Sequence, residues 1–196
     1  MENNILIVNR HFYPSYQSGG PVRSLVNLTA VLSNSYNIDL ITSASDLKNQ
    51  WMASINNCNA IYTSTFFYTI KTLIKLDSSK YRLVYLNSFF DARFSLLFLL
   101  YFSFAKGFKG SIVLAPRGEL THGAFRFKKT KKNLYLSLFK FLKLDKNVVY
   151  HFTSNEEMHE SQLYIGANAK SILIPNMHEK TKDIDSLDKV EGHTKV

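Results

Sequence analysis

The residues best suited to chemistry lie in the run Ala-Pro-Arg-Gly-Glu-Leu-Thr-His at positions 115–122. Arg117 offers a planar guanidinium, which can hold a phosphate or carboxylate through two parallel hydrogen bonds. His122 titrates near neutral pH and can exchange a proton with a substrate hydroxyl. Glu119 adds a second ionisable group, and Gly118 gives the turn a flexible backbone. A structural interpretation stays equally open, in which Arg117 pairs with a carboxylate and His122 enters a helix.

A second candidate is the glycine pair Gly19-Gly20, which precedes Pro21 at the expected start of a helix. Two glycines let a ligand approach the backbone closely, and the free N–H groups of a helix start favour an anion. The alternative is that Gly20 only caps the helix. No G-x-G-x-x-G pattern follows the first expected strand, which disfavours binding of an NAD-type cofactor.

A third polar segment, residues 152–157, favours a structural role, because Thr153 or Ser154 can cap a helix that has glutamates in its first turn. The histidine and cysteine pattern disfavours a metal site. Cys58 is the single cysteine, and no H-E-x-x-H occurs. One cysteine also allows no internal disulfide, which fits the reducing cytoplasm. We expect no metal and no cofactor.

Short apolar runs alternate with helical patterns along most of the chain, and these elements must position the three candidates. Strands are expected at 5–8, 38–42, 60–62, 83–86, 112–115, 148–152 and 171–174, and helices at 21–32, 68–76, 92–105, after 115 and at 155–165. This alternation predicts an α/β fold: a doubly wound, mostly parallel, Rossmann-like sheet with helices on both faces. Ligands of such sheets lie beyond the carboxyl ends of the strands, where all three segments project.

Length and hydropathy define the domain. With 196 residues, 45% of them hydrophobic, the chain can bury one full core, which we assign to residues 1–175. Residues 176–196 are charged and poor in large apolar side chains, so they predict a tail or the start of an interdomain linker. The longest apolar run, 94–105, is shorter than the ~18–20 residues of a spanning helix and predicts a buried helix. The first residues lack a signal-peptide pattern, which disfavours secretion.

Positive charge is concentrated in one segment. Between residues 106 and 146 eleven basic residues accompany two acidic ones, so this segment carries a charge equal to the +9 of the whole chain. A localised field of this kind favours an anionic partner: phosphate groups, an acidic membrane surface or nucleic acid. Nucleic acid is disfavoured, because no helix-turn-helix, zinc-finger or RNA-stacking signature is present.

The helix expected in this segment has an apolar stripe at helical spacing, formed by Leu134, Leu138, Phe141 and Leu142. Such a helix can pack on its own domain with lysines outward, or it can lie on an anionic bilayer. The sequence leaves both arrangements open. The candidates for contact with a membrane surface are Lys128, Lys129, Lys131 and Lys132.

Taken in order, these motifs resemble the N-terminal half of a GT-B-fold glycosyltransferase of the family-4 retaining group. The matching pieces, spread over residues 5–176, are Phe12-Tyr13-Pro14, Gly19-Gly20-Pro21-Val22-Arg23, Ala115-Pro116-Arg117-Gly118-Glu119-Leu120, Lys131-Lys132-Asn133-Leu134-Tyr135, Phe152-Thr153-Ser154-Asn155-Glu156 and Ile172-Leu173-Ile174-Pro175-Asn176. Their shared order and their position at strand ends carry the resemblance.

The resemblance implies that this domain holds the sugar acceptor, while a second domain holds the nucleotide sugar, a co-substrate. It implies that Gly19 and Gly20 lie near the donor diphosphate, and that Arg117, Gly118 and His122 lie on the acceptor side. Family members make capsule, O-antigen and other surface polysaccharides, which implies a lipid-linked acceptor at the inner face of the plasma membrane. The family's donor-site pair of glutamates, separated by seven residues, is absent.

Two functions therefore compete. The first is the acceptor-binding half of a sugar transferase, active with a donor domain in the same chain or in a separate subunit. The alternative is a non-catalytic module that docks on a membrane or a partner, or the remnant of a truncated transferase.

Overall fold

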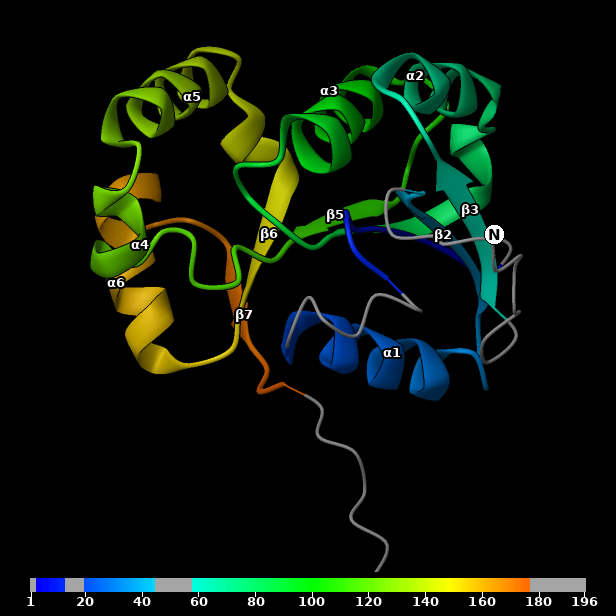
Figure 1. Cartoon of the computed structure of the whole chain (residues 1–196), viewed down its shortest axis with the longest axis horizontal. Coiled ribbons are helices and arrows are strands. Elements are labelled where there is room, and N and C mark those ends of the chain that lie inside the picture. The colour runs from blue at the N-terminus through cyan, green and yellow to red at the C-terminus, as the bar shows by residue number, and fades with distance from the viewer. Residues whose placement is uncertain (1–2, 13–19, 45–57, 177–196) are drawn as a thin grey trace, which may run out of the picture.

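The computed structural model describes residues 3–12, 20–44 and 58–176. Seven parallel strands form one sheet in the order β3-β2-β1-β4-β5-β6-β7 (Figure 1). The strands are β1 (Asn4–Val8), β2 (Asn37–Ser43), β3 (Cys58–Thr63), β4 (Tyr81–Leu86), β5 (Ser111–Leu114), β6 (Val148–Phe152) and β7 (Ser171–Leu173). The chain runs outward from β1 to β3, returns to β4 beside β1, and runs outward again to β7. This order confirms the doubly wound, Rossmann-like prediction.

The helices connect successive strands. They are α1 (Gly20–Leu32), α2 (Phe66–Lys75), α3 (Leu97–Phe104), α4 (His122–Arg126), α5 (Lys129–Phe141) and α6 (Asn155–Ile165). Alternate residues of β1 face opposite layers, as a strand's period of two requires. Leu6 and Val8 join the core under α2, α3 and α5, whereas Ile5 and Ile7 join a second core with Leu25 of α1.

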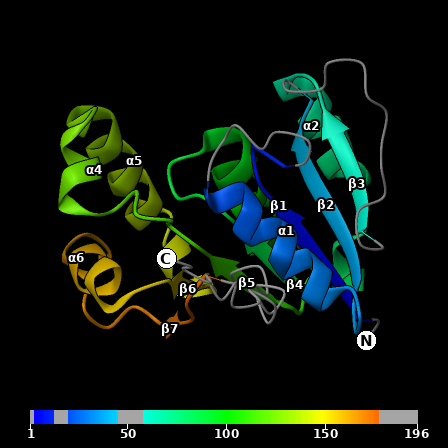
Figure 2. The same ribbon diagram turned by 60° about the horizontal axis from the view of Figure 1, so that its bottom comes forward.

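Helices therefore cover both faces of the sheet. Figure 1 shows α5, α3 and α2 on one side of the sheet and α1 on the other. Figure 2 shows α1 in front, with α4 and α5 toward one side of it and α2 toward the other. The apolar run at 94–105 contributes Phe98, Leu99 and Phe102 to the core, which confirms the expected buried helix. Within the described ranges, no helix combines the length and the apolar character that a bilayer-spanning segment needs.

Two expected helices differ from the structure in their details. The helix expected from residue 92 starts as a π-helical turn, Ala92–Leu96, and the Asp91 carboxylate caps it by accepting from the backbone N–H groups of Arg93 and Phe94. The basic helix after β5 is divided into α4 and α5, because Lys128 between them adopts a left-handed φ of 56°. Of the expected tail, residues 177–196 lie outside the described residues.

Candidate functional site

Polar side chains converge where the strands end, around the position between β1 and β4 at which the strand order reverses. This position is where doubly wound sheets bind their ligands. The participating segments follow β1, β4, β5, β6 and β7. We call this group of loops the carboxyl edge.

Arg117 lies at the centre of the carboxyl edge, in a tight turn closed by a 3.1 Å hydrogen bond from the Glu119 N–H to the Pro116 carbonyl. The φ angles of Arg117 and Gly118 are 55° and 78°, so both central residues are left-handed. This conformation is uncommon for a residue other than glycine. The turn therefore fixes the direction in which the Arg117 side chain leaves the backbone.

The Arg117 guanidinium connects three segments of the chain. Its Nε donates to Asn87 Oδ1 (2.6 Å), its Nη1 to Asn176 Oδ1 (2.6 Å) and its Nη2 to the Tyr85 hydroxyl (2.8 Å). These bonds use three of the five N–H groups that a guanidinium carries. All three acceptors are neutral, so among the described residues no carboxylate forms a direct ion pair with the Arg117 guanidinium.

Tyr85 and His151 extend this network into the sheet. The Tyr85 hydroxyl lies 2.8 Å from His151 Nδ1, and His151 Nε2 lies 2.8 Å from the Ile174 carbonyl. A carbonyl only accepts, so Nε2 carries the proton and the Tyr85 O–H donates to Nδ1. Burial lowers the pKa of His151 and raises the pKa of Tyr85 to about 12. The ring is neutral with both nitrogens bonded, so it is a positioning group.

Asn87 is a buried residue of the carboxyl edge whose side chain carries an unpaired donor. It is 4% exposed, its Oδ1 accepts from Arg117, and its N–H donates to the Val8 carbonyl of β1. Its Nδ2 is buried and has no hydrogen-bond partner among the residues that the structure describes. An unpaired buried donor costs about 1–3 kcal/mol. The position of this donor, at the strand-order reversal, is where a ligand or an ordered water would accept from it.

The Glu119 carboxylate accepts hydrogen bonds from the loop after β4. One carboxylate oxygen accepts from Ser88 Oγ (2.7 Å), and the other accepts from the backbone N–H groups of Phe89 (2.6 Å) and Phe90 (2.9 Å). These charge-assisted bonds hold the loop after β4 against the turn that contains Arg117. Glu119 thus orients the carboxyl edge and has both oxygens occupied.

The Gly118 N–H is also occupied, because it donates to Glu157 Oε1 (2.6 Å). The other Glu157 oxygen accepts from the N–H and the hydroxyl of Thr153. Ser154 Oγ accepts from the Glu157 N–H, which confirms the helix cap predicted for residues 153–157. The loop after β6 is therefore tied to the turn after β5.

His122 lies apart from Arg117, at the start of α4. Its backbone N–H donates to Glu160 Oε2 of α6 (2.6 Å), and its exposed ring has Nδ1 3.4 Å from the Tyr164 hydroxyl. The ring is open to solvent, while its backbone joins α4 to α6. The structure thus brings Glu119 and Gly118 to the Arg117 turn and leaves His122 at the α4–α6 junction.

Of the two glycine candidates, Gly20 lies within the described residues and Gly19 does not. Gly20 is the first residue of α1, is exposed, and would have no atom within 4 Å of an added Cβ. Pro21 is the second residue of α1, and Gly19 lies outside the described residues. Ser24, one turn further along α1, donates to Asn176 Oδ1 (3.1 Å), the same oxygen that Arg117 contacts. The first turns of α1 therefore border the Arg117 network.

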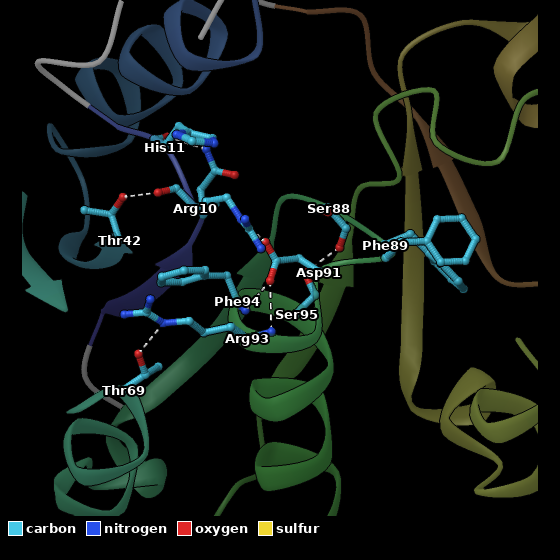
Figure 3. Close-up of polar contacts among 12 residues, drawn as sticks. Arg10, His11, Thr42, Thr69, Ser88, Phe89, Asp91, Arg93, Phe94 and Ser95 are labelled. Carbon is cyan, nitrogen blue, oxygen red and sulfur yellow. Dashed lines mark hydrogen bonds and ion pairs between the residues drawn. The ribbon is translucent and has the colours of Figure 1, made fainter. Parts of the chain in front are cut away.

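Sequence reasoning missed a second polar group at the carboxyl edge, shown in Figure 3. Arg10, which follows β1, pairs with the buried Asp91 carboxylate at 2.7 Å. Arg93 donates to the hydroxyls of Thr69 and Thr63 and to the Thr63 carbonyl, all of them neutral. Burial and the nearby Arg10 charge lower the pKa of Arg93. The signal in the sequence was the location of Arg10 and Asp91 just beyond two expected strands.

The four lysine candidates separate into two kinds. Lys128, Lys129 and Lys131 are exposed. Lys132 is half-buried: its Nζ donates to the carbonyls of Ala124 (2.7 Å) and Glu119 (3.3 Å), and burial lowers its pKa. The ammonium also lies over the rings of Phe90 (4.7 Å) and Phe125 (5.7 Å). Lys132 therefore fastens α5 to α4.

Two further features lie elsewhere. A hollow of about 480 Å³ opens at the amino-terminal side of β6 and β7, between Asp145-Lys146 and residues 166–170, away from the carboxyl edge. Among the described residues, no group of three or more His, Cys, Asp or Glu side chains could hold a metal ion.

Comparison with known proteins adds no assignment: neither a protein-family model nor a curated protein matches this chain. The evidence on function is therefore the geometry of the carboxyl edge and of the surface around it.

Proposed function

We propose that this domain is the acceptor-binding half of a glycosyltransferase for bacterial surface polysaccharide. It holds a lipid-linked saccharide while a donor domain, in the same chain or in a separate subunit, supplies the nucleotide sugar. The observation that carries the proposal is the pair formed by Asn87 and Arg117. Among the described residues, a buried amide donor without a partner adjoins a guanidinium that has only neutral hydrogen-bond partners, at the position where the strand order reverses.

The chemistry of the carboxyl edge suits an anion that carries hydroxyl groups. Arg117 has two further N–H groups, Asn87 has its Nδ2, and the start of α1 adds backbone N–H groups and a positive dipole end. A lipid-linked saccharide offers diphosphate oxygens to such donors. The neutral, fully bonded His151 holds Tyr85 and through it Arg117, so these residues position the acceptor and leave departure of the nucleotide to the donor domain.

The proposal places the protein in the cytoplasm, peripheral at the inner face of the plasma membrane, because a lipid-linked acceptor is anchored there. We assign Lys128, Lys129 and Lys131 to contact with that anionic surface, since all three are exposed. The competing function, a non-catalytic docking module, is favoured by the apolar side chains exposed on α5.

Calorimetric titration of the chain tests acceptor binding, with geranyl-diphosphate-linked N-acetylglucosamine as the probe. We expect saturable binding that is tighter than binding of inorganic pyrophosphate. UDP-glucose should bind weakly, because the nucleoside pocket belongs to the donor domain.

Asn87→Asp is the sharpest variant for this titration. It keeps the oxygen that Arg117 contacts but replaces the free donor by an acceptor, so affinity for the probe should fall about tenfold or more. Asn34→Asp, at an exposed position, is the charge-matched control and should bind normally. Absence of probe binding, or unchanged affinity in Asn87→Asp, contradicts the proposal. Equal affinity for the probe and for pyrophosphate also contradicts it, because a saccharide acceptor is then not recognised.

A further inference from the structure

Helix α5 is apolar on two opposite sides. Its inward side chains Leu136 and Phe139 are buried, and the Phe139 ring lies 5.1 Å from that of Phe89. Its outward side carries Leu134, Leu138 and Phe141, of which Leu134 is 73% and Phe141 81% exposed. The stripe noted in the sequence thus faces solvent, except for Leu142, which packs against the core. We call Leu134, Leu138 and Phe141 the outer stripe.

Exposed apolar side chains also occur on the helices beside α5. Figure 1 shows α2 and α3 in a row with α5 on the same side of the sheet. Phe67 and Ile74 of α2 and Phe104 at the end of α3 are strongly exposed. Exposed large apolar side chains thus occur on three helices on the same side of the sheet, which favours association on this side.

The charges on these helices have one sign. The segments of α2, α3, α4 and α5 contain no Asp or Glu, whereas α6 contains Glu156, Glu157 and Glu160. Exposed lysines accompany the apolar side chains, at Lys71 and Lys75 on α2 and at Lys129, Lys131 and Lys140 on α5. Exposed apolar side chains and exposed ammonium groups on the same helices match hydrocarbon beneath a layer of phosphates.

We propose that the outer stripe inserts into the headgroup region of an anionic lipid bilayer, with Lys128, Lys129 and Lys131 against lipid phosphates. The inference deepens the membrane attachment in the proposed function, but it rests on exposure and charge and requires no sugar acceptor. Lys132 is excluded from the lipid contact, because its ammonium is already bound between α4 and α5.

Sedimentation of the full chain with vesicles of phosphatidylcholine and phosphatidylglycerol tests the proposal. The variant Leu134→Ser/Leu138→Ser/Phe141→Ser should bind about tenfold more weakly or worse, because each removed side chain contributes apolar burial. The matched control Val31→Ser/Leu163→Ser changes exposed apolar residues on α1 and α6 and should bind normally. Circular dichroism of each variant verifies its fold.

Charge variants separate the electrostatic contribution to vesicle binding from the apolar contribution. Lys128→Gln/Lys129→Gln/Lys131→Gln should weaken binding about tenfold and reduce its dependence on salt. Lys132→Gln should leave vesicle binding unchanged and lower the melting temperature instead. Pure phosphatidylcholine vesicles should bind less of the unsubstituted chain.

A fluorophore at position 141 reports insertion directly. Cys58 is buried, so a Phe141→Cys variant offers the accessible thiol for an environment-sensitive dye. We expect a blue shift of its emission on anionic vesicles, and no shift for a dye at Leu163→Cys. Asn87→Asp should bind vesicles fully, which separates failure of this inference from failure of the acceptor proposal.

Three results overturn the inference. The first is that anionic vesicles do not retain the unsubstituted chain, and the second is that they retain the outer-stripe variant equally well. Alternatively, the chain self-associates without lipid and the outer-stripe variant is monomeric, in which case the stripe is a contact between copies of this chain.

Discussion

The carboxyl edge and the outward side of α5 differ in what their side chains already contact. At the carboxyl edge Arg117, Glu119 and Glu157 bind other loops of the same chain. On α5, Leu134 and Phe141 are largely exposed. The comparison teaches that residue type alone does not identify a site. The informative groups are those without a partner among the described residues, namely Asn87 Nδ2 in one region and the exposed outer stripe in the other.

The two regions should also respond differently to substitution. Changes among the bonded residues of the carboxyl edge, or on the inward side of α5, lower stability because they remove existing contacts. Changes on the outward side of α5 leave stability nearly unchanged and act on association. The following predictions test this contrast in order of decreasing effect.

We expect the largest difference in unfolding free energy between substitutions at two phenylalanines of α5. Phe139 is 1% exposed and Phe141 is 81% exposed. Phe139→Ala should lower the free energy of unfolding by about 3–5 kcal/mol, because it leaves a cavity under the helix. Phe141→Ala should change it by less than about 0.5 kcal/mol. Urea denaturation followed by circular dichroism measures both, and similar losses in the two variants would show that the orientation of α5 is wrong.

A substitution at Glu119 tests whether its hydrogen bonds stabilise the loops of the carboxyl edge. Glu119→Ala removes the acceptor of three donors and should cost about 2–3 kcal/mol in unfolding free energy. The control Glu156→Ala, an exposed residue in the first turn of α6, should stay within about 0.5 kcal/mol of the unsubstituted chain. If Glu119→Ala is as stable as its control, the loop after β4 does not depend on this carboxylate.

Arg117 should have a smaller effect on stability. Arg117→Ala removes three hydrogen bonds to neutral groups, two of them on the buried residues Asn87 and Tyr85, and should cost about 1–2 kcal/mol. Arg117→Lys should not restore the loss, because one ammonium cannot reach three acceptors arranged around a planar fork. Thermal melts compare both variants with Arg23→Ala, an exposed arginine of α1. Full recovery in Arg117→Lys would reduce the role of Arg117 to its charge.

His151 should contribute a mild pH dependence. Burial lowers its folded-state pKa below the ordinary value of 6.5, so the unfolded chain binds the proton first as the pH falls. The stability from neutral His151 is therefore present above about pH 6.5 and is lost as the pH falls through that value toward the folded pKa. His151→Gln keeps a donor and an acceptor but does not titrate, so its denaturation midpoint should vary less with pH. An unchanged pH profile would contradict a buried, neutral His151.

Much of the fold could be predicted from the sequence, because apolar runs and helical spacing alternate regularly and a parallel sheet needs few other signals. Arg117, Gly118 and Glu119 were also expected at the carboxyl edge, since they follow a strand directly. Their partners could not be predicted. Tyr85 and His151 are 66 positions apart, Arg10 and Asp91 are 81 apart, and only the order of strands in the sheet brings them together.

The orientation of α5 could not be predicted either. Spacing shows that Leu134, Leu138 and Phe141 share one side, but Leu136 and Phe139 form a second apolar side. Which of the two is buried depends on Phe89 and Phe90 of the loop after β4, whose rings pack against Tyr135 and Phe139 of α5. A helix with two apolar sides is therefore the case in which periodicity alone is insufficient.

The most direct test of the account is sedimentation with anionic vesicles, measured with and without a lipid-linked N-acetylglucosamine in the bilayer. The account predicts that the saccharide lipid increases binding of the unsubstituted chain, and that Asn87→Asp loses this increase while it keeps the underlying vesicle binding. The outer-stripe variant should lose the underlying binding. If the increase survives Asn87→Asp, or if vesicle binding survives removal of the outer stripe, the two regions do not have the separate roles proposed for them.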